Sequence, residues 1–226
     1  MQPTYLPWPG FFDLIAHSDT FVFLDDAKLE KSSWHVRNKI LVNQTAVFIT
    51  VELNAARNSL IKDAHLADSR WRKKHAQMLK ITYGKSPFGR EVLDIVLPII
   101  EDGNQKILAD INIDLITGFC KYFGIETNLV RSSDLIIDGK RSERLIEICR
   151  RLGADQYYSP AGSRDYIEEE ALFPDSGIKL TYQHFVSRPY PQFNSKEFIA
   201  HLSVVDLIAN LGKTASLAYV IQSNPS

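Results

Sequence analysis

The sequence predicts a three-layer α/β fold in which helices cover a mostly parallel, Rossmann-like sheet. Three observations support this prediction. Short apolar runs alternate with helical patterns in the second half, amphipathic helical patterns fill the middle, and the composition is globular, with 45% hydrophobic and 23% charged residues. Strand–helix–strand alternation with short connections implies right-handed crossovers and therefore parallel strands. The length of 226 residues suits one domain over residues 1–226.

The first third of the chain predicts a loop followed by mostly extended elements. Three prolines in residues 2–10 exclude a regular helix or central strand there. The apolar run over residues 21–24 ends at Asp25 and Asp26, which favours a strand buried on both faces. The expected elements are the loop 2–10, a helix over 11–16, a strand over 21–24, and a hairpin of 39–42 with 46–51.

The middle of the chain predicts a helical insertion over about residues 69–124, and the rest predicts alternating elements. Apolar side chains recur at helical spacing up to Phe123, and Gly124 then favours a helix end. The expected helices are 69–83, 88–101 with an irregularity at Pro98, 105–123, 142–152 and 163–172. The expected strands are 125–130, 156–159 and 178–182, and two or three short helices are expected in the tail over about residues 195–222.

Composition restricts the class of protein. Lys and Arg total 26 and Asp and Glu total 27, so the net charge of −1 argues against a strongly basic nucleic-acid binder. The two cysteines suit buried thiols in a reducing compartment. No apolar run of about 18 residues predicts insertion into a membrane, and no signal-peptide pattern is found at the start. We therefore expect a cytoplasmic protein.

The common catalytic and cofactor motifs do not occur in this sequence. Gly212-Lys213-Thr214 matches the end of a phosphate-binding loop, but Leu207 stands where its first glycine belongs, so a helix C-terminus is the preferred interpretation. There is no G-x-G-x-x-G, H-E-x-x-H, C-x-x-C, G-x-S-x-G or D-x-D. The sequence therefore predicts no metal site and leaves the cofactor unknown.

The segment over residues 2–13 is unusually rich in proline and aromatic residues. It runs into a predicted helix N-terminus, which can bind an anion, and Gly10 would let a ligand approach the backbone. Tyr5 and Trp8 could stack on a base or sugar. The alternative is that these two aromatic side chains cap the core. Gln2 is included among the candidate binding residues.

A second candidate segment covers residues 31–39, after the predicted strand that ends at Asp26. Ligands of open α/β sheets collect at the carboxyl ends of strands. Arg37 offers a planar fork for phosphate or carboxylate, and Lys31 offers a point charge. Trp34 and Asn38 complete this candidate set. The alternative is an ordinary solvated basic loop.

Further candidates begin helices or occupy rigid loops. Glu143 and Arg144 open one predicted helix, where Glu143 could simply complement the helix dipole. His75 lies on a predicted helix, and the alternative for it is a satisfied interior histidine. Four more binding residues lie at a strand end or in rigid turns: Tyr158, Gly162, Tyr190 and Gln192.

Together these segments resemble the WbqC-like family of bacterial proteins over nearly the whole chain. The Gln-Pro-x-Tyr-x-Pro-Trp-x-Gly signature begins at Gln2, and the similarity continues in order. The other matching segments are 21–26, 31–38, 71–75, the stretch around Asn112, 141–144, 158–166, 190–192 and 202–212. The family usually has a hydrophobic strand directly before the Gln-Pro pair, where this sequence has Met1. The resemblance therefore implies a missing strand or an earlier start.

The resemblance implies an enzyme of bacterial surface-polysaccharide synthesis, which transfers an acyl or aminoacyl group to a nucleotide-linked amino sugar. The alternatives are a nucleotidyl or adenylyl transferase and a non-catalytic partner of other polysaccharide-synthesis enzymes. One of four side chains would take the proton from the attacking amine: Asp13, Asp26, His75 or Glu143. Six residues from separate segments are expected to meet in one cleft: Trp8, Asp26, Arg37, Arg144, Gly162 and Gln192.

Overall fold

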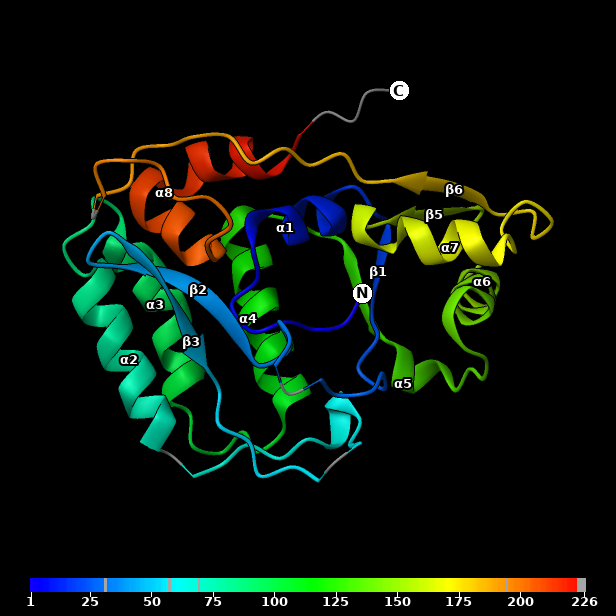
Figure 1. Ribbon diagram of the computed structural model, residues 1–226, viewed down its shortest axis with the longest axis horizontal. Helices are drawn as coiled ribbons and strands as arrows, with labels where there is room; N and C mark the ends of the chain where they lie inside the picture. Colours follow the sequence, from blue (N-terminus) through cyan, green and yellow to red (C-terminus); the bar gives the residue numbers. More distant parts are fainter. Residues whose placement is uncertain (31, 57, 69, 194, 223–226) are drawn as a thin grey trace.

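The protein is a mixed α/β chain, and a computed structural model describes all of it except residues 31, 57, 69, 194 and 223–226. Figure 1 shows the order of its elements in space. They are α1 (Pro9–Ala16), β1 (Thr20–Phe23), β2 (Arg37–Val42), β3 (Thr45–Thr50), η1 (Ile61–Asp63), α2 (Arg70–Tyr83), α3 (Gly89–Glu101), α4 (Leu108–Phe123), β4 (Asn128–Arg131), α5 (Ser132–Leu135), α6 (Arg141–Arg151), β5 (Gln156–Ser159), η2 (Ala161–Ser163), α7 (Arg164–Glu170), β6 (Lys179–Tyr182) and α8 (Val204–Val220).

The strands form small sheets rather than one large sheet in the described residues. β1 pairs with β4 and β5 pairs with β6, both in parallel, whereas β2 and β3 form an antiparallel hairpin. The predicted strands and their parallel direction are therefore confirmed. The expected single sheet is divided into two parallel pairs, because no hydrogen-bonded ladder joins β1 to β5 among these residues. The two pairs run in different directions in Figure 1.

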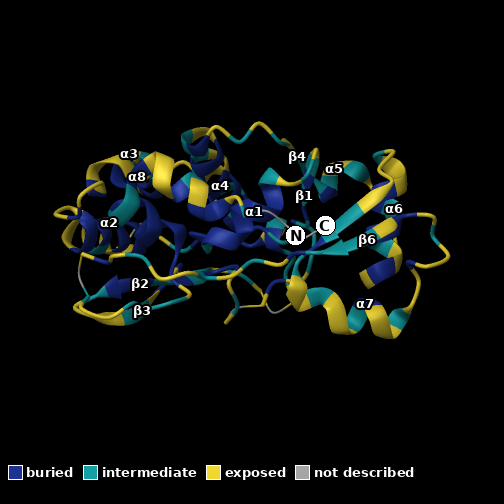
Figure 2. Ribbon diagram, turned by 90° about the horizontal axis from the view of Figure 1, so that it is seen from above, coloured by how far each residue is buried: buried dark blue, intermediate teal, exposed yellow. Residues whose placement is uncertain are grey.

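Two hydrophobic cores hold these elements. The larger core lies among α1, α2, α3, α4, α8 and the first strands, and it includes the fully buried Trp71 and Phe119. The smaller core joins α6, α7, β5 and β6 around Leu145 and Ile167. Figure 2 shows α1 largely buried, whereas β3 and α7 are largely exposed or intermediate. We call the elements around the larger core the larger body and the elements around the smaller core the smaller body.

The helices agree with the expected positions, and local chemistry explains where they end. α4 ends at Gly124, whose φ of 79° allows the left-handed cap that other residues adopt at a cost. Pro98 lies inside α3, near the helix end. The tail holds α8, which consists of two helical segments joined by a kink at Gly212, in agreement with the expected two or three short helices. The hydroxyl of Ser203 caps the start of α8 by accepting from the Val205 N–H. No helix among the described residues is both long and apolar enough to cross a bilayer.

Gly212 lies at the kink where the first helical segment of α8 ends, which agrees with the sequence interpretation of the Gly212-Lys213 pair as a helix end. Its φ of 67° and ψ of −176° belong to a region that is almost restricted to glycine. A Cβ atom at this position would lie 2.6 Å from Cδ1 of Phe88. The glycine therefore lets α8 kink and lets α3 approach it closely.

We expect Gly212→Ala to lower the free energy of unfolding by about 2–4 kcal/mol, because it adds backbone strain and an overlap with Phe88. Urea denaturation followed by circular dichroism measures this loss. Gly103→Ala is the matched control, since its Cβ would meet nothing within 4 Å and its φ is not positive. Equal stability of the two variants would contradict the strain argument.

Candidate functional site

The proline-rich loop and the segment before β2, two segments singled out by sequence, lie side by side. The Tyr5 N–H donates to the Trp34 carbonyl at 3.0 Å. Two buried asparagines hold the pair in place. Asn38 donates to the carbonyl of Leu6 at 2.8 Å, and Asn112 donates to one carbonyl of each segment, at 3.1 and 2.8 Å. The chain folds this way because prolines leave the loop carbonyls without a ladder partner.

Trp8 and Gly10 pack against protein at the start of α1. The Trp8 and Phe185 rings meet edge to face, with centroids 5.3 Å apart. A Cβ on residue 10 would overlap the Trp8 ring and would lie 2.9 Å from the Phe185 ring. The space that was expected to admit a ligand at Gly10 is therefore filled by these rings. Ligand stacking on Trp8 stays a prediction.

His75 is an interior residue of α2. Its side chain is 3% exposed, and its Nδ1 lies 2.9 Å from the Tyr5 hydroxyl. Burial lowers the pKa of His75 to about 4, against a smaller opposing effect from a hydrogen bond to the backbone of Thr50. At neutral pH the ring is uncharged and shielded from solvent, which agrees with the interior alternative for this residue.

A polar cluster lies where β1 and β4 end, and it joins the two bodies. The carboxylate of Asp25 is fully buried and accepts from the Ser133 N–H at 3.1 Å and the Ser133 hydroxyl at 2.8 Å. The neighbouring Asp26 accepts from the Ser132 hydroxyl at 2.6 Å and from Arg144 at 2.5 Å. Arg144 belongs to α6, so this ion pair connects the end of β1 to the smaller body. We call Asp25, Asp26, Arg131, Ser132, Ser133 and Arg144 the strand-end cluster.

Arg131 is a second cation of the strand-end cluster, and the sequence analysis missed it. Its side chain is 34% exposed, and its Nη1 lies 2.8 Å from Asp110 and 3.9 Å from Asp25. The Arg144 side chain is 22% exposed and that of Asp26 17%. The missed residues 131–133 directly follow a predicted strand, so the strand-end rule could have found them. The arrangement offers two guanidinium groups and one part-exposed carboxylate to a ligand.

A second polar group surrounds Asp13 in α1. Its carboxylate is 1% exposed and accepts from the Gln183 amide at 2.7 Å and, at longer range, from the Tyr158 hydroxyl at 3.4 Å. The Nδ1 of His17 lies 3.2 Å from the other Asp13 oxygen. The buried carboxylate is surrounded by protein donors, so this group ties the smaller body to α1.

A third polar group connects a rigid loop to α8. The buried Asp206 carboxylate accepts from the Tyr190 hydroxyl at 2.8 Å and from the Gln192 amide at 2.9 Å. Burial raises the pKa of Asp206 and that of Tyr190. The loop carrying two predicted binding residues is thus held against α8 by these bonds.

The expected convergence on one cleft is found for one pair and not for the whole set. Asp26 and Arg144 are in contact. Trp8 packs on Phe185, Gln192 binds Asp206, and the Arg37 guanidinium lies over the Phe48 ring at 4.3 Å. Glu143 and Gly162 are exposed, and Lys31 lies outside the described residues. The structure therefore distributes the predicted site residues over several groups.

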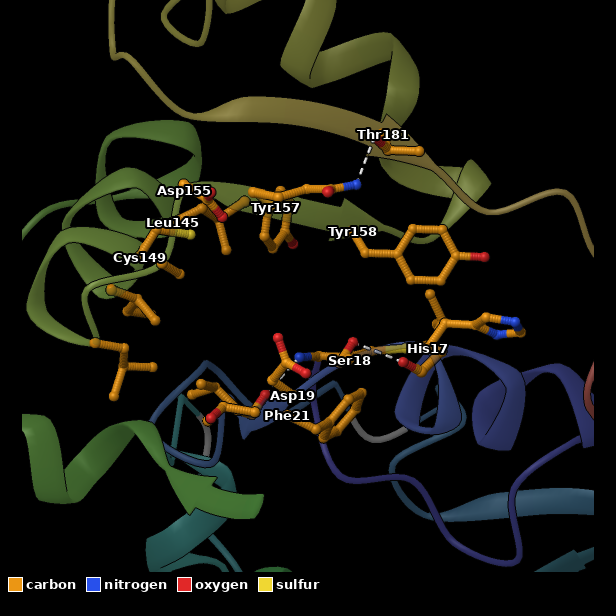
Figure 3. A pocket seen from close by; sticks show the side chains of 18 of the residues that line it. His17, Ser18, Asp19, Phe21, Leu145, Cys149, Asp155, Tyr157, Tyr158 and Thr181 are labelled. Carbon is orange, nitrogen blue, oxygen red and sulfur yellow. Dashed lines mark hydrogen bonds between the residues drawn. The ribbon is translucent and has the colours of Figure 1, made fainter. Parts of the chain in front are cut away.

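A cavity of about 460 Å³ separates β1 from β5 and α6. Figure 3 shows Tyr157 and Cys149 on one wall and Phe21 on the other. The main chain of Met1 forms a parallel bridge beside it, donating to the Val22 carbonyl at 2.7 Å and accepting from the Leu24 N–H at 2.9 Å. This wall is therefore the edge of a strand, whereas a small-molecule site gathers convergent side-chain groups. Polar side chains also line this cavity, among them His17, Asp19 and Asp155. The residues of the strand-end cluster are not part of its lining.

The described chain is thus a mixed α/β protein with polar side chains gathered at the carboxyl ends of a parallel strand pair, a usual place for ligands. It belongs to the WbqC-like protein family, whose model matches residues 2–217. The "Uncharacterized protein Rv1507c" of Mycobacterium tuberculosis (strain ATCC 25618 / H37Rv) is 31% identical over 218 residues, covering 95% of this chain and 94% of that protein. No solved structure matches. The family resemblance seen in the sequence is confirmed.

We expect the protonation of His75 to make the free energy of unfolding fall at acidic pH. The unfolded chain binds this proton below the ordinary pKa of 6.5, whereas the folded chain binds it only below about 4. Stability is therefore lost as the pH falls from 6.5 towards 4, by roughly 2–3 kcal/mol at pH 4.5. The measurement is the difference in free energy of unfolding between wild type and His75→Gln from pH 7.5 to 4.5. The exposed His184, changed to Gln, is the control; equal pH slopes for wild type and His75→Gln would contradict the expectation.

Proposed function

We propose that the protein is a transferase of bacterial surface-polysaccharide (O-antigen or lipopolysaccharide) synthesis, which adds an acyl or aminoacyl group to a nucleotide-linked amino sugar. Membership of the WbqC-like family supports the biological setting through the resemblance described above. The observation that carries the proposal is the strand-end cluster, where Arg144 pairs with the part-exposed Asp26 and the part-exposed Arg131 lies 3.9 Å from the neighbouring Asp25.

The charges of this cluster suit the two ends of such a substrate. A pyrophosphate brings about two negative charges, and a guanidinium can bind two of its oxygens at once. Arg144 and Arg131 supply these groups. Asp26 would bind the sugar amine and accept its proton as the new N–C bond forms. The bond between the acyl carbon and its leaving group breaks in that step, and the leaving group keeps the electron pair.

Within this proposal, Ser132 and Asp25 are positioning residues. Ser132 donates to Asp26 and so orients one of its oxygens, while the other faces Arg144. The buried Asp25 holds the start of α5 through Ser133. A ligand would displace part of the Asp26–Arg144 ion pair, and its phosphate oxygens would replace the carboxylate as the partner of Arg144.

We expect Arg144→Gln to weaken binding of UDP-glucosamine about 10-fold to 100-fold, because a hydrogen bond to a charged group contributes roughly 1.5–3 kcal/mol. Asp26→Asn should remove the preference for UDP-glucosamine over UDP-glucose, which lacks the amine, while UDP-glucose affinity stays unchanged. Isothermal titration calorimetry measures both effects, and Arg90→Gln, whose side chain is 93% exposed in α3, is the control.

Other results would favour the alternatives. Binding of ATP that requires a divalent metal would favour a nucleotidyl transferase. Binding of the amino sugar without any transfer, across a panel of activated acyl donors, would favour a non-catalytic partner. Unchanged affinity in a well-folded Arg144→Gln protein would remove the strand-end cluster from the site.

A further inference from the structure

Two large aromatic side chains stand half exposed on the outer face of the β2–β3 hairpin. Trp34 is 48% exposed and Phe48 is 42% exposed. Their ring centroids are 6.0 Å apart, with the rings tilted by 42°. By contrast, Trp71 is fully buried in the larger core. Adjacent exposed rings on one face offer stacking surface that the core does not use.

Two cations flank the same face. The Arg37 guanidinium lies 4.3 Å and the Lys39 ammonium 5.3 Å from the centre of the Phe48 ring. Lys39 is directly opposite Phe48 in the antiparallel register, so both belong to one face of the hairpin. No ion pair joins Arg37 or Lys39 to a carboxylate within the described part of the chain. The face therefore carries positive charge that an anion could complement.

The backbone beneath this face is held firmly. The Trp34 carbonyl accepts from Tyr5, the His35 carbonyl accepts from the buried Asn112, and the Val36 carbonyl accepts from Val51 at 2.8 Å. Three successive residues are thus tied to three different parts of the larger body. A site whose backbone is already ordered loses less entropy when a ligand binds.

We propose that this face, defined by Trp34, Arg37, Lys39 and Phe48, binds a nucleoside diphosphate. The base stacks on Trp34, and Arg37 and Lys39 bind the diphosphate oxygens. The flat base of the nucleotide complements the exposed Trp34 and Phe48 rings, and the two negative charges of the diphosphate complement Arg37 and Lys39. Because the proposed function places the pyrophosphate of its substrate at Arg131 and Arg144, this face is a second, separate diphosphate site, and the proposal rests on the proposed function only for the class of nucleotide. Asp26 and Trp34 lie on the same connection between β1 and β2.

Fluorescence and calorimetry with UDP, uridine and inorganic pyrophosphate test this assignment. UDP should quench the emission of the exposed Trp34, and Trp34→Leu should abolish the quenching and weaken UDP binding at least 10-fold. Arg37→Gln should weaken UDP and pyrophosphate by about 10-fold to 100-fold and should leave uridine nearly unchanged. Melting curves confirm that each variant is folded.

Matched controls remove an exposed aromatic and an exposed arginine elsewhere. Phe193→Leu and Arg90→Gln should both bind UDP like the wild type, because these exposed side chains lie outside the proposed face. Wild-type UDP affinity in folded Trp34→Leu and Arg37→Gln proteins would overturn the proposal. Tighter binding of an oligothymidylate or an acidic peptide than of UDP at this face would also overturn it, in favour of that partner.

The two proposals can fail separately. If UDP binds at the hairpin and UDP-glucosamine shows no advantage over UDP-glucose, the amino-sugar function fails and the nucleotide site stands. If Asp26→Asn and Arg144→Gln change amino-sugar binding while the hairpin variants change nothing, the nucleotide site fails and the function stands.

Discussion

The buried, proline-rich loop over residues 2–8 constrains the rest of the structure, because its carbonyl groups need donors from elsewhere in the chain. Proline supplies no N–H and prevents a ladder, so donors from distant parts of the chain satisfy these carbonyls. Asn38 in β2 and Asn112 in α4 do so. The Val204 N–H donates to the Pro7 carbonyl at 2.7 Å. Leaving such a buried carbonyl unsatisfied costs about 1–3 kcal/mol. These bonds therefore set the hairpin, the helical insertion and the start of α1 in fixed positions relative to one another.

The same need for hydrogen-bond partners applies to the buried carboxylates at the junction of the two bodies. Asp25 ends β1 in a fully buried position, and its carboxylate is satisfied by the start of α5 just beyond β4. The next residue, Asp26, then faces Arg144 of the smaller body. Gln183, which follows β6, reaches Asp13 on the other side of the junction. Polar contacts thus join bodies with separate apolar cores, and a ligand that binds between Asp26 and Arg144 would act on this junction.

Local patterns in the sequence predicted the helices and strands. They could not predict how strands from distant parts of the chain pair with one another. The strand over 156–159 and the parallel direction of both pairs follow from apolar runs separated by helices. The division of the expected sheet into pairs depends on contacts between distant segments, which no local pattern encodes. The hairpin was expected, but the contact between Arg37 and the Phe48 ring was not. This contact depends on the exact strand register, because a shift of one residue would move Phe48 to the opposite face of the hairpin. Residues 131–133 carried a usable signal, since they directly follow a strand.

The three tryptophans show why aromatic density alone does not distinguish packing from binding. Trp71 fills the larger core, and Trp8 lies between Gly10 and Phe185 at the start of α1. Trp34 is also anchored by its backbone, yet nearly half of its side chain meets solvent. All three sit in aromatic-rich or basic sequence that looks alike from composition. The property that separates them is whether protein covers the second face of the ring, and this depends on the tertiary structure. A binding role is therefore best argued for the tryptophan whose backbone is held while its ring stays open.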